Sequence, residues 1–461
     1  MTGVDWRSAD RWLTGESYVG SFIPDYLNML CRKIGTRWGG SSGERRAASY
    51  LRGELDSCGL ENPAVERFQI ESWESAASNI EVPGRPQWRA EARPALFSPP
   101  VDVSGPVVDA GYGMPHELDV LRRRLRGAIA LVNAGLEPFS DPVAFASRLE
   151  ALAGAGARAA VTPSASGGRR THHISGSDWR DGKPSGGALP LVQTTKEDGA
   201  ELARLAVEGA MVRLVSQSRR FTATSGNVVA ELPGEHWPGE HILLGAHYDT
   251  TPDSPGANDN GSGTSVVLET ARLLSGLRSE LGVGPGRTIR FVFFGSEEQT
   301  LQGSFAYVAR HHGKEAIPRL MINLDELSTG NMKGVALVFP ELRALVQRSL
   351  DELGHGLKCH VMAQLDASGD MFPFACAGIP SAMLWRWRFV GRHPDAGFGH
   401  SSADTLDKVR VNELKEYAAL LARLLLRLSH VPPGQWPANR LSTKEIRLRL
   451  QSERGTVLRT M

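Results

Sequence analysis

The chain has 461 residues and a net charge of +1, with 41% hydrophobic and 22% charged residues. This balance is typical of a globular protein and predicts no general attraction to nucleic acid or to an anionic membrane surface. A single hydrophobic core rarely extends over so long a chain, so we expect one large domain and a smaller one. No apolar run approaches the about 18 residues that would indicate a membrane-spanning helix, so no membrane partner is expected.

The N-terminal stretch and the cysteines bear on the cellular compartment. The first residues, MTGVDWRSADRWLTGE, are polar and lack the apolar centre of a secretory signal. The four cysteines (Cys31, Cys58, Cys359 and Cys376) are scattered and form no C-x-x-C pair. Scattered cysteines favour reduced thiols over a disulfide framework. Together these features predict a cytoplasmic protein.

The segments along the chain differ in texture. After a polar lead, residues 26–35 and 42–60 are expected to be helices, the second with Ser42 as its N-cap. Residues 76–222 mix short β-like runs, helix-like runs and a Gly/Ser-rich loop, which predicts a small inserted α+β or β-rich domain. The main domain is then expected to combine residues 1–75 with residues 223–430. Residues 431–461 form a basic C-terminal extension, either a peripheral helix or a loose tail.

The main domain contains continuous apolar runs that alternate with helical patterns. HILLGA, IRFVFFGS and LMINL are such runs, at residues 241–246, 289–296 and 320–324. Continuous apolar strands between helices predict an α/β fold with a mixed, mainly parallel sheet flanked by helices on both faces. Ligand sites in such sheets lie beyond the carboxyl ends of the strands.

Each of these three runs is followed by residues that can bind a metal or transfer a proton. They are His247 and Asp249, Glu297 and Glu298, and Asp325 and Glu326. The loop GFGHSSADT adds His400, and the glycine-rich turn GANDNGSG adds Asp259. One such residue alone is usually a cap or a solvated loop residue. Several gathered at one edge would repel one another unless cations lie among them.

The side-chain types narrow the choice of metal. Imidazole and carboxylate without a cysteine set favour zinc, with manganese or cobalt as substitutes. Two histidines and three acids exceed the needs of one catalytic zinc, and suit two metals about 3.5–4 Å apart that share a carboxylate. Asp259 is the best bridge because the glycines around it allow close backbone approach. Of the adjacent Glu297 and Glu298, one can bind metal while the other takes a proton from water.

At these residues the chain resembles the two-zinc aminopeptidase family, which also contains glutamate carboxypeptidase-like enzymes. The resemblance covers about residues 223–430, and IGTRWGGSSGERRAASYL resembles the family's N-terminal helical lead. The matching stretches are GAHYDT, GANDNGSG, FVFFGSEEQTLQGS, INLDEL, SGDMFPFACAGIPSAML and GHSSADT. The resemblance implies the zinc-exopeptidase fold for the main, catalytic domain.

The resemblance also implies which residues hold the metals. His247 and Asp325 would bind one zinc, Glu298 and His400 would bind the other, and Asp259 would bridge the two.

The resemblance implies further roles close to the metals. Glu297 would be the general base, and Asp249 would orient His247 through the far ring nitrogen. The Asp259–Asn260 peptide bond is typically cis in this family.

Residues 76–222 resemble a protease-associated domain in LRGAIALVNAG, GARAAVTPS and LPLVQTTKEDGAEL. In relatives that carry it, this domain lies beside the active-site mouth and can narrow access. His172 and His173 fall within this segment, and we interpret them as loop residues.

The chain departs from the family at two places. Relatives often carry a tyrosine shortly before the last histidine to stabilise an oxyanion, whereas this chain has HPDAGFGH with Phe398. Arg392 or His393 could replace it, or the metals could act alone. Glu326 follows Asp325 where relatives vary, and it is a candidate to bind a substrate ammonium.

The expected activity is zinc-dependent hydrolysis at the end of a peptide or aminoacyl substrate, with the attacking hydroxide bridging two metals. An aminopeptidase acting on free N-termini is the first choice. A carboxypeptidase, an N-acyl amino acid amidohydrolase, a one-zinc glutaminyl cyclase-like transferase and a catalytically silent binding protein stay as alternatives. The tract Trp385–Phe389 could line a substrate pocket or be a core strand. The substrate and the oligomeric state, including a homo-oligomer, stay open.

Overall fold

A computed structural model describes residues 4–76, 78–386, 397–437 and 441–452. It divides into two compact units, Met1–Ile70 with Thr224–Ser452, and Glu71–Ala223. The strands β1 (Glu61–Ser75) and β9 (Ser218–Leu232) each contain one of these divisions. Because both strands are continuous through a division, composition alone could place the expected boundaries at 76 and 222 only approximately. Within the described residues, no helix is long and apolar enough to cross a membrane.

The first unit contains an eight-stranded sheet with the order β1-β9-β11-β10-β12-β15-β13-β14. Its further strands are β10 (Trp237–His247), β11 (Arg287–Phe294), β12 (Leu320–Asn323), β13 (Met332–Leu337), β14 (Lys358–Val361) and β15 (Ser381–Arg386). Strand β10 runs parallel to β11 and β12, and β12 runs parallel to β15. Strand β9 is antiparallel to β11, and β13 is antiparallel to β15 and parallel to β14. The mixed α/β class predicted from the sequence is confirmed.

The central strands are apolar on successive residues because both of their faces are covered. Leu243 of β10 packs in one cluster with Tyr307 of α8 (Gln302–His311) and Phe374 of α10 (Met371–Cys376). Its neighbours Ile242 and Leu244 point to the opposite face, since side chains alternate along a strand, and both are fully buried. Helix α7 (Gly263–Leu281) packs against β10, and α11 (Val411–His430) packs against β11.

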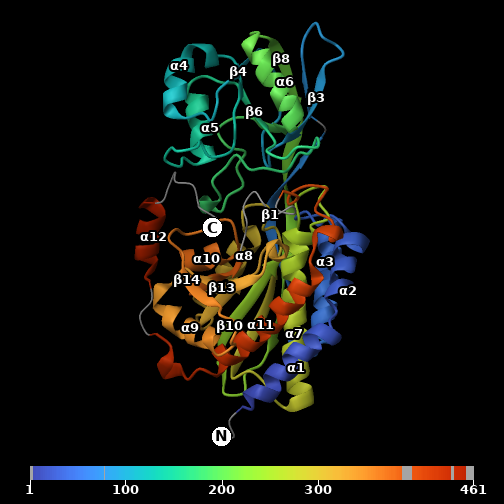
Figure 1. Ribbon diagram of the computed structural model, residues 1–461, viewed down its shortest axis with the longest axis vertical. Coiled ribbons are helices and arrows are strands. Elements are labelled where there is room, and N and C mark those ends of the chain that lie inside the picture. The colour runs from blue at the N-terminus through green and yellow to red at the C-terminus, as the bar shows by residue number, and fades with distance from the viewer. Residues whose placement is uncertain (1–3, 77, 387–396, 438–440, 453–461) are drawn as a thin grey trace. The chain divides into compact units, whose positions relative to one another are not determined.

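The remaining helices surround this sheet. They are α1 (Trp6–Val19), α2 (Ile23–Leu27), α3 (Ser42–Ser57), α9 (Arg343–Asp351) and α12 (Thr443–Ser452), and Figure 1 shows α1, α7 and α11 together. The sequence did not predict α1, whose buried residues Ala9, Leu13 and Ser17 include one large apolar side chain. Helix α12 lies in the C-terminal extension and packs against α10, so the peripheral-helix alternative is the correct one there.

Helix α3 begins at Ser42, one residue earlier than expected, because Ser41 and not Ser42 caps it. The Ser41 side chain accepts a hydrogen bond from Glu44 N at 3.1 Å, and Glu44 Oε2 accepts one from Gly40 N at 2.6 Å. The first bond caps the helix, and the second ties Glu44 to the residue before the N-cap. Glu44 also accepts a hydrogen bond from Ser225 Oγ of β9, which ties the helix to the sheet. Burial raises the pKa of this carboxyl to about 8.

The second unit is built around a closed barrel with the strand order β2-β3-β7-β6-β5-β4-β8. Its elements are β2 (Ser78–Glu81), β3 (Arg89–Pro94), β4 (Val101–Asp109), α4 (Pro115–Leu125), β5 (Ile129–Leu131), α5 (Phe145–Gly154), β6 (Ala159–Pro163), β7 (Leu191–Thr194), α6 (Lys196–Val207) and β8 (Met211–Ser216). One core cluster joins the barrel to Leu202 and Leu205 of α6. A second joins it to Leu125 of α4 and Leu149 of α5.

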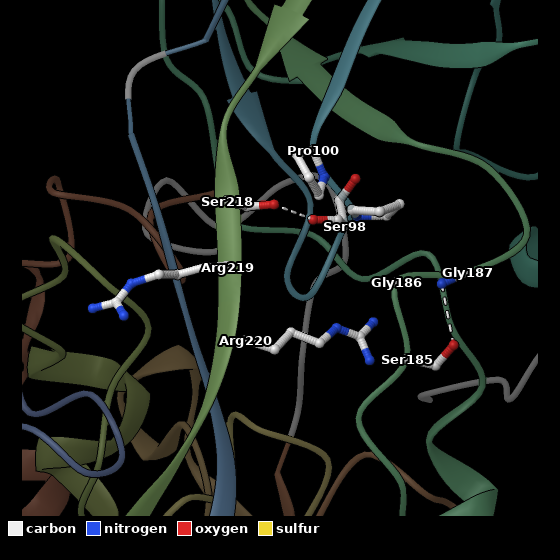
Figure 2. A pocket seen from close by; sticks show the side chains of 9 residues that line it. Ser98, Pro100, Ser185, Gly186, Gly187, Ser218, Arg219 and Arg220 are labelled. Atoms are coloured by element: carbon white, nitrogen blue, oxygen red, sulfur yellow. Dashed lines mark hydrogen bonds between the residues drawn. The ribbon is translucent and has the colours of Figure 1, made fainter.

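The second unit also contains a hollow of about 330 Å³. Figure 2 shows Ser218 donating a hydrogen bond to the Ser98 carbonyl, and Gly187 N donating one to Ser185 Oγ. Arg220 Nη2 donates a hydrogen bond to the Phe97 carbonyl at 2.9 Å. These three hydrogen bonds all join segments of the second unit to one another. We therefore interpret the polar groups around the hollow as stabilising its loops and do not assign a ligand to it.

The buried Glu44 makes stability depend on pH. The folded state keeps its proton up to about pH 8, whereas an exposed glutamate loses its proton near 4.5. Between these values the folded state binds more protons than the unfolded state, so the stability contributed by this group falls as pH rises. We expect Glu44→Gln to gain stability relative to wild type as pH rises from about 5 to about 8. Denaturant midpoints measured across this range in a chelating buffer test it. The exposed Glu61→Gln control should follow wild type at every pH, and a pH-independent difference for Glu44→Gln would contradict the assignment.

Candidate active site

The ends of the central strands bring candidate residues to one edge of the sheet. In the parallel register His247 lies opposite Phe294, and Gly245 lies opposite Asn323. The segments that follow β11 and β12 therefore leave the sheet beside His247. They carry Glu297 and Glu298 after β11, and Asp325 after β12. His400 comes from the loop that follows β15, and Asp259 lies in the turn Ala257–Ser262 before α7.

The five predicted metal ligands lie together in two groups that share one carboxylate. His247 Nε2 lies 3.3 Å from Asp259 Oδ1 and 3.4 Å from Asp325 Oδ1. His400 Nε2 lies 3.0 Å from Asp259 Oδ2 and 3.1 Å from Glu298 Oε2. The two oxygens of Asp259 therefore face different imidazoles, which is the arrangement that a bridging carboxylate requires.

Several atoms of this cluster are buried without a hydrogen-bond partner in the described part of the chain. They are both ring nitrogens of His247, both carboxylate oxygens of Glu298, and Asp325 Oδ1. The side chains of His247 and Glu298 are 1% and 2% exposed. Buried polar atoms normally have partners, because each one without a partner destabilises the fold. Nitrogen and carboxylate donors that converge in this way fit a metal of the zinc type.

Glu297 lies at the side of the first group, with Oε2 4.0 Å from His247 Nε2. Burial, reinforced by neighbouring acids, raises its pKa well above the ordinary value. Burial also raises the pKa of Glu298, to about 7. Burial lowers the pKa of His247, but the carboxylates of Glu297 and Asp325 outweigh it and raise that pKa well above the ordinary value. The cluster thus concentrates negative charge that a cation would stabilise.

Asp249 joins His247 to the turn that carries the adjacent glutamates. Its Oδ1 lies 3.4 Å from His247 Nδ1, on the ring side opposite to Asp259. The same carboxylate accepts hydrogen bonds from Glu297 N at 3.0 Å and from Glu298 N at 3.2 Å. Asp249 therefore lies beside the ring nitrogen that the resemblance implied it would orient. The two backbone contacts were not predicted.

Asp404 holds the turn of Asp259, a role that the sequence did not reveal. Its Oδ1 accepts a hydrogen bond from Asn258 N at 2.9 Å, and its Oδ2 accepts one from Asp259 N at 3.0 Å. Its carbonyl accepts a third from Ala257 N at 3.1 Å. Asp404 lies four residues after His400, so it links the loop of one ligand to the turn of another. Its place in the motif GHSSADT was the one available signal.

Arg37 holds the loop between His247 and Asp259. This arginine is fully buried, and its guanidinium donates to the carbonyls of Tyr248 at 2.6 Å and Pro255 at 2.9 Å. It also donates to Leu30, Gly35 and Gly256. A planar fork of donors can satisfy several carbonyls at once, which a lysine cannot.

The turn of Asp259 is also hydrogen-bonded to the segment after β12. Asn260 Nδ2 donates to the Leu324 carbonyl at 2.8 Å, and Leu327 N donates to Ser262 Oγ at 2.8 Å. Asn258 Oδ1 accepts from Ser328 N at 2.9 Å. The Asp259–Asn260 peptide is cis, as the resemblance implied.

The described residues directly before His400 are Gly397, Phe398 and Gly399, and none of them is a tyrosine. Phe398 accepts a hydrogen bond from Ser401 Oγ through its carbonyl, and Lys408 Nζ lies 4.7 Å from the centre of its ring. Arg392 and His393, the suggested replacements, lie outside the described residues. So do residues 387–389 of the tract that could line a pocket.

The second unit contains two histidine groups with local roles. His173 Nε2 lies 2.6 Å from Arg93 Nη1, and His172 N donates a hydrogen bond to Gln193. Both contacts fasten the loop in which the two histidines were expected. His116 also lies near Glu117 and Glu137 within metal-binding distance. The His116 side chain is 65% exposed, however, and Glu117 caps α4 by accepting backbone hydrogen bonds.

Comparison with known proteins finds similarity over the segment that carries this site. Residues 227–425 match Peptidase family M28. Aminopeptidase YwaD of Bacillus subtilis (strain 168) is 26% identical over 412 residues, which cover 86% of this chain and 82% of that protein. Carboxypeptidase Q of Bos taurus is 26% identical over 410 residues, which cover 86% of this chain and 83% of that protein. The solved structure of BSAP, a zinc aminopeptidase from Bacillus subtilis, has the same fold, with a TM-score of 0.69 and 24% identity over 92% of this chain and 97% of that chain.

The matched segment contains the whole candidate site. All five candidate ligands, together with Asp249 and Glu297, lie between residues 227 and 425. The chain is therefore a metallo-exopeptidase, and the segment that carries its candidate site is similar to Peptidase family M28.

Proposed function

We propose that this exopeptidase is a two-zinc aminopeptidase, which hydrolyses the N-terminal residue from peptides or aminoacyl compounds. The observation that carries the proposal is the shared carboxylate of Asp259, whose two oxygens face His247 at 3.3 Å and His400 at 3.0 Å. One carboxylate between two sets of ligands suits a pair of metals.

The proposed ligands divide into two sets around Asp259. His247 and Asp325 hold one ion, Glu298 and His400 hold the other, and Asp259 contacts both. Zinc suits this mixture of imidazole and carboxylate, and manganese or cobalt are substitutes. When bound, such metals lower the pKa of water and polarise a carbonyl.

The residues around the metals have separate roles in the proposed hydrolysis. The Glu297 carboxylate takes the proton of the attacking water and delivers it to the leaving amine. Its neighbour Glu298 is occupied by metal, so the adjacent acids do not compete for one role. The Asp249 carboxylate lies on the Nδ1 side of His247, where it would accept a hydrogen bond from Nδ1–H and leave Nε2 to bind metal. Asp249 also holds the backbone N–H groups of both glutamates, so it sets the base relative to that histidine.

A carboxypeptidase is the second candidate function. The similarity to Carboxypeptidase Q favours it, because that similarity covers as much of this chain as the similarity to Aminopeptidase YwaD. Both activities would use the same metal ligands, so the difference must come from groups that contact the end of the substrate.

We also propose that the second unit is a protease-associated domain. Its compact β-rich barrel with three packed helices supports this assignment. In relatives that carry such a domain it limits access to the active site.

Metal content and substrate preference test the proposed function together. We expect about two equivalents of zinc per chain in elemental analysis. Aminoacyl p-nitroanilides with a free amine should be cleaved, and their N-acetylated counterparts should not. Cleavage of N-blocked peptides at a free C-terminus would instead establish the carboxypeptidase alternative. A single bound zinc without hydrolysis would favour a cyclase-like transferase.

Replacing Glu297 tests the base. Glu297→Gln keeps the size of the side chain but cannot accept the proton, so turnover should fall by about 10²- to 10⁴-fold. The zinc content should stay at the wild-type value, because Glu297 is not a proposed ligand. Glu150→Gln, on the exposed face of α5, is the control and should retain full activity. Hydrolysis at the wild-type rate by Glu297→Gln would remove the assignment.

Replacing Asp404 tests how the bridging carboxylate is held. In Asp404→Asn one oxygen becomes an N–H donor that faces backbone donors, so the turn of Asp259 should loosen. We expect zinc affinity, measured by competition with a chromogenic chelator, to fall about 10- to 100-fold. Asp407→Asn lies in the same loop, with a side chain 68% exposed, and should bind zinc as wild type does. Equal affinity in both variants would show that Asp404 does not position the site.

A further inference from the structure

We propose that Glu326 recognises the free α-ammonium group of the substrate and thereby selects the N-terminal end of a peptide. This inference rests on the proposed aminopeptidase function and adds a specificity residue to it. Glu326 is the residue that the sequence indicates as a candidate to bind a substrate ammonium, and in the structure it lies next to the turn of Asp259.

Glu326 lies beside the shared carboxylate. Its Oε1 lies 3.5 Å from Asn258 Nδ2, in the turn that carries Asp259. A Cβ added to Gly399 would lie 3.3 Å from the same Oε1 and 3.7 Å from Asp259 Oδ2. Two carboxylate oxygens therefore border one small volume next to His400.

The backbone directs Glu326 away from the ligand that precedes it. Asp325 Oδ1 reaches His247, whereas Glu326 has a left-handed conformation with φ 48° and reaches Asn258. The Asn258 amide is itself oriented, because its Oδ1 accepts a hydrogen bond from Ser328 N at 2.9 Å. Consecutive acids thus serve different parts of the site.

The position of Glu326 suits an ammonium group. Glu326 belongs to neither of the two groups of residues in the site that could hold a metal. An ammonium has three donors and forms charge-assisted hydrogen bonds with carboxylates. A C-terminal carboxylate at the same place would be repelled by Glu326. The same side chain therefore favours an N-terminus and disfavours a C-terminus.

The glycine at 399 keeps this volume accessible from the chain segment that carries His400. Any larger residue there would meet both carboxylate oxygens. In this chain, the Glu326 carboxylate borders the space next to His400.

Glu326→Gln tests the inference in the zinc-loaded full chain. For alanyl p-nitroanilide we expect kcat/KM to fall about 10- to 100-fold, mainly through a higher KM. The dissociation constant of alanine hydroxamate should rise by a similar factor in calorimetry, whereas that of N-acetylalanine hydroxamate should not change. Glu326→Asp should recover part of the loss, and Glu280→Gln, an exposed site on α7, should match wild type.

The outcomes separate this inference from the function on which it rests. If wild type prefers free amines and Glu326→Gln keeps the same preference in both assays, the inference is wrong and the aminopeptidase function stands. If wild type prefers N-blocked substrates, both are wrong. If wild type hydrolyses none of these substrates, binding of the two hydroxamates still tests the inference. Wild type should bind alanine hydroxamate more tightly than N-acetylalanine hydroxamate, and this difference should shrink in Glu326→Gln. An unchanged difference would show that the inference is wrong.

Discussion

The carboxylate of Asp259 contacts two imidazoles that come from distant parts of the chain, and the rest of the site is arranged around it. His247 ends a central strand, and His400 lies about a hundred and fifty residues later in a loop. Both reach Asp259 within hydrogen-bonding or ion-pair distance. Any shift of the turn of Asp259 therefore changes both groups at once.

The protein holds this turn mainly through its backbone. Asp404 accepts hydrogen bonds from the backbone N–H groups of Asn258 and Asp259. Arg37 donates hydrogen bonds to carbonyls of the loop that leads to this turn. Asp249 likewise accepts hydrogen bonds from the backbone N–H groups of the two glutamates after β11. Because hydrogen bonds to charged side chains are stronger than neutral ones, each buried charge outside the ligand set stabilises one loop. This leaves the side chains of the ligands directed toward the proposed metals.

The acids of the site have different environments despite their proximity. Glu298 faces His400, Glu297 lies at the edge of the other group, and Glu326 lies beyond both. These positions separate three tasks that acids can perform, namely holding a cation, transferring a proton and binding a charged substrate group. Glu297 and Glu298 follow the same strand β11, whereas Glu326 follows β12, so the first two acids share a loop and differ in the direction of their side chains.

The predictions that succeeded concern features that are local in the sequence. Apolar runs followed by His247, Glu298 and Asp325 were recognisable because a parallel sheet collects the ends of its strands at one edge. Helix α1 was missed because its buried face contains small and polar residues such as Ala9 and Ser17. The cap of α3 was placed one residue too late, since two serines in a row leave the choice to backbone geometry.

The sequence by itself determined the α/β class, the candidate ligands and the resemblance to a two-zinc exopeptidase. These depend on residue type and spacing, which any chain displays without folding. Only the tertiary structure decided that Asp404 supports Asp259, that Arg37 organises the loop and that Glu326 borders the shared carboxylate. The contact between Asp404 and Asp259 spans 145 residues, so no local pattern can encode it. Such contacts exist only when the folded backbone brings the segments together.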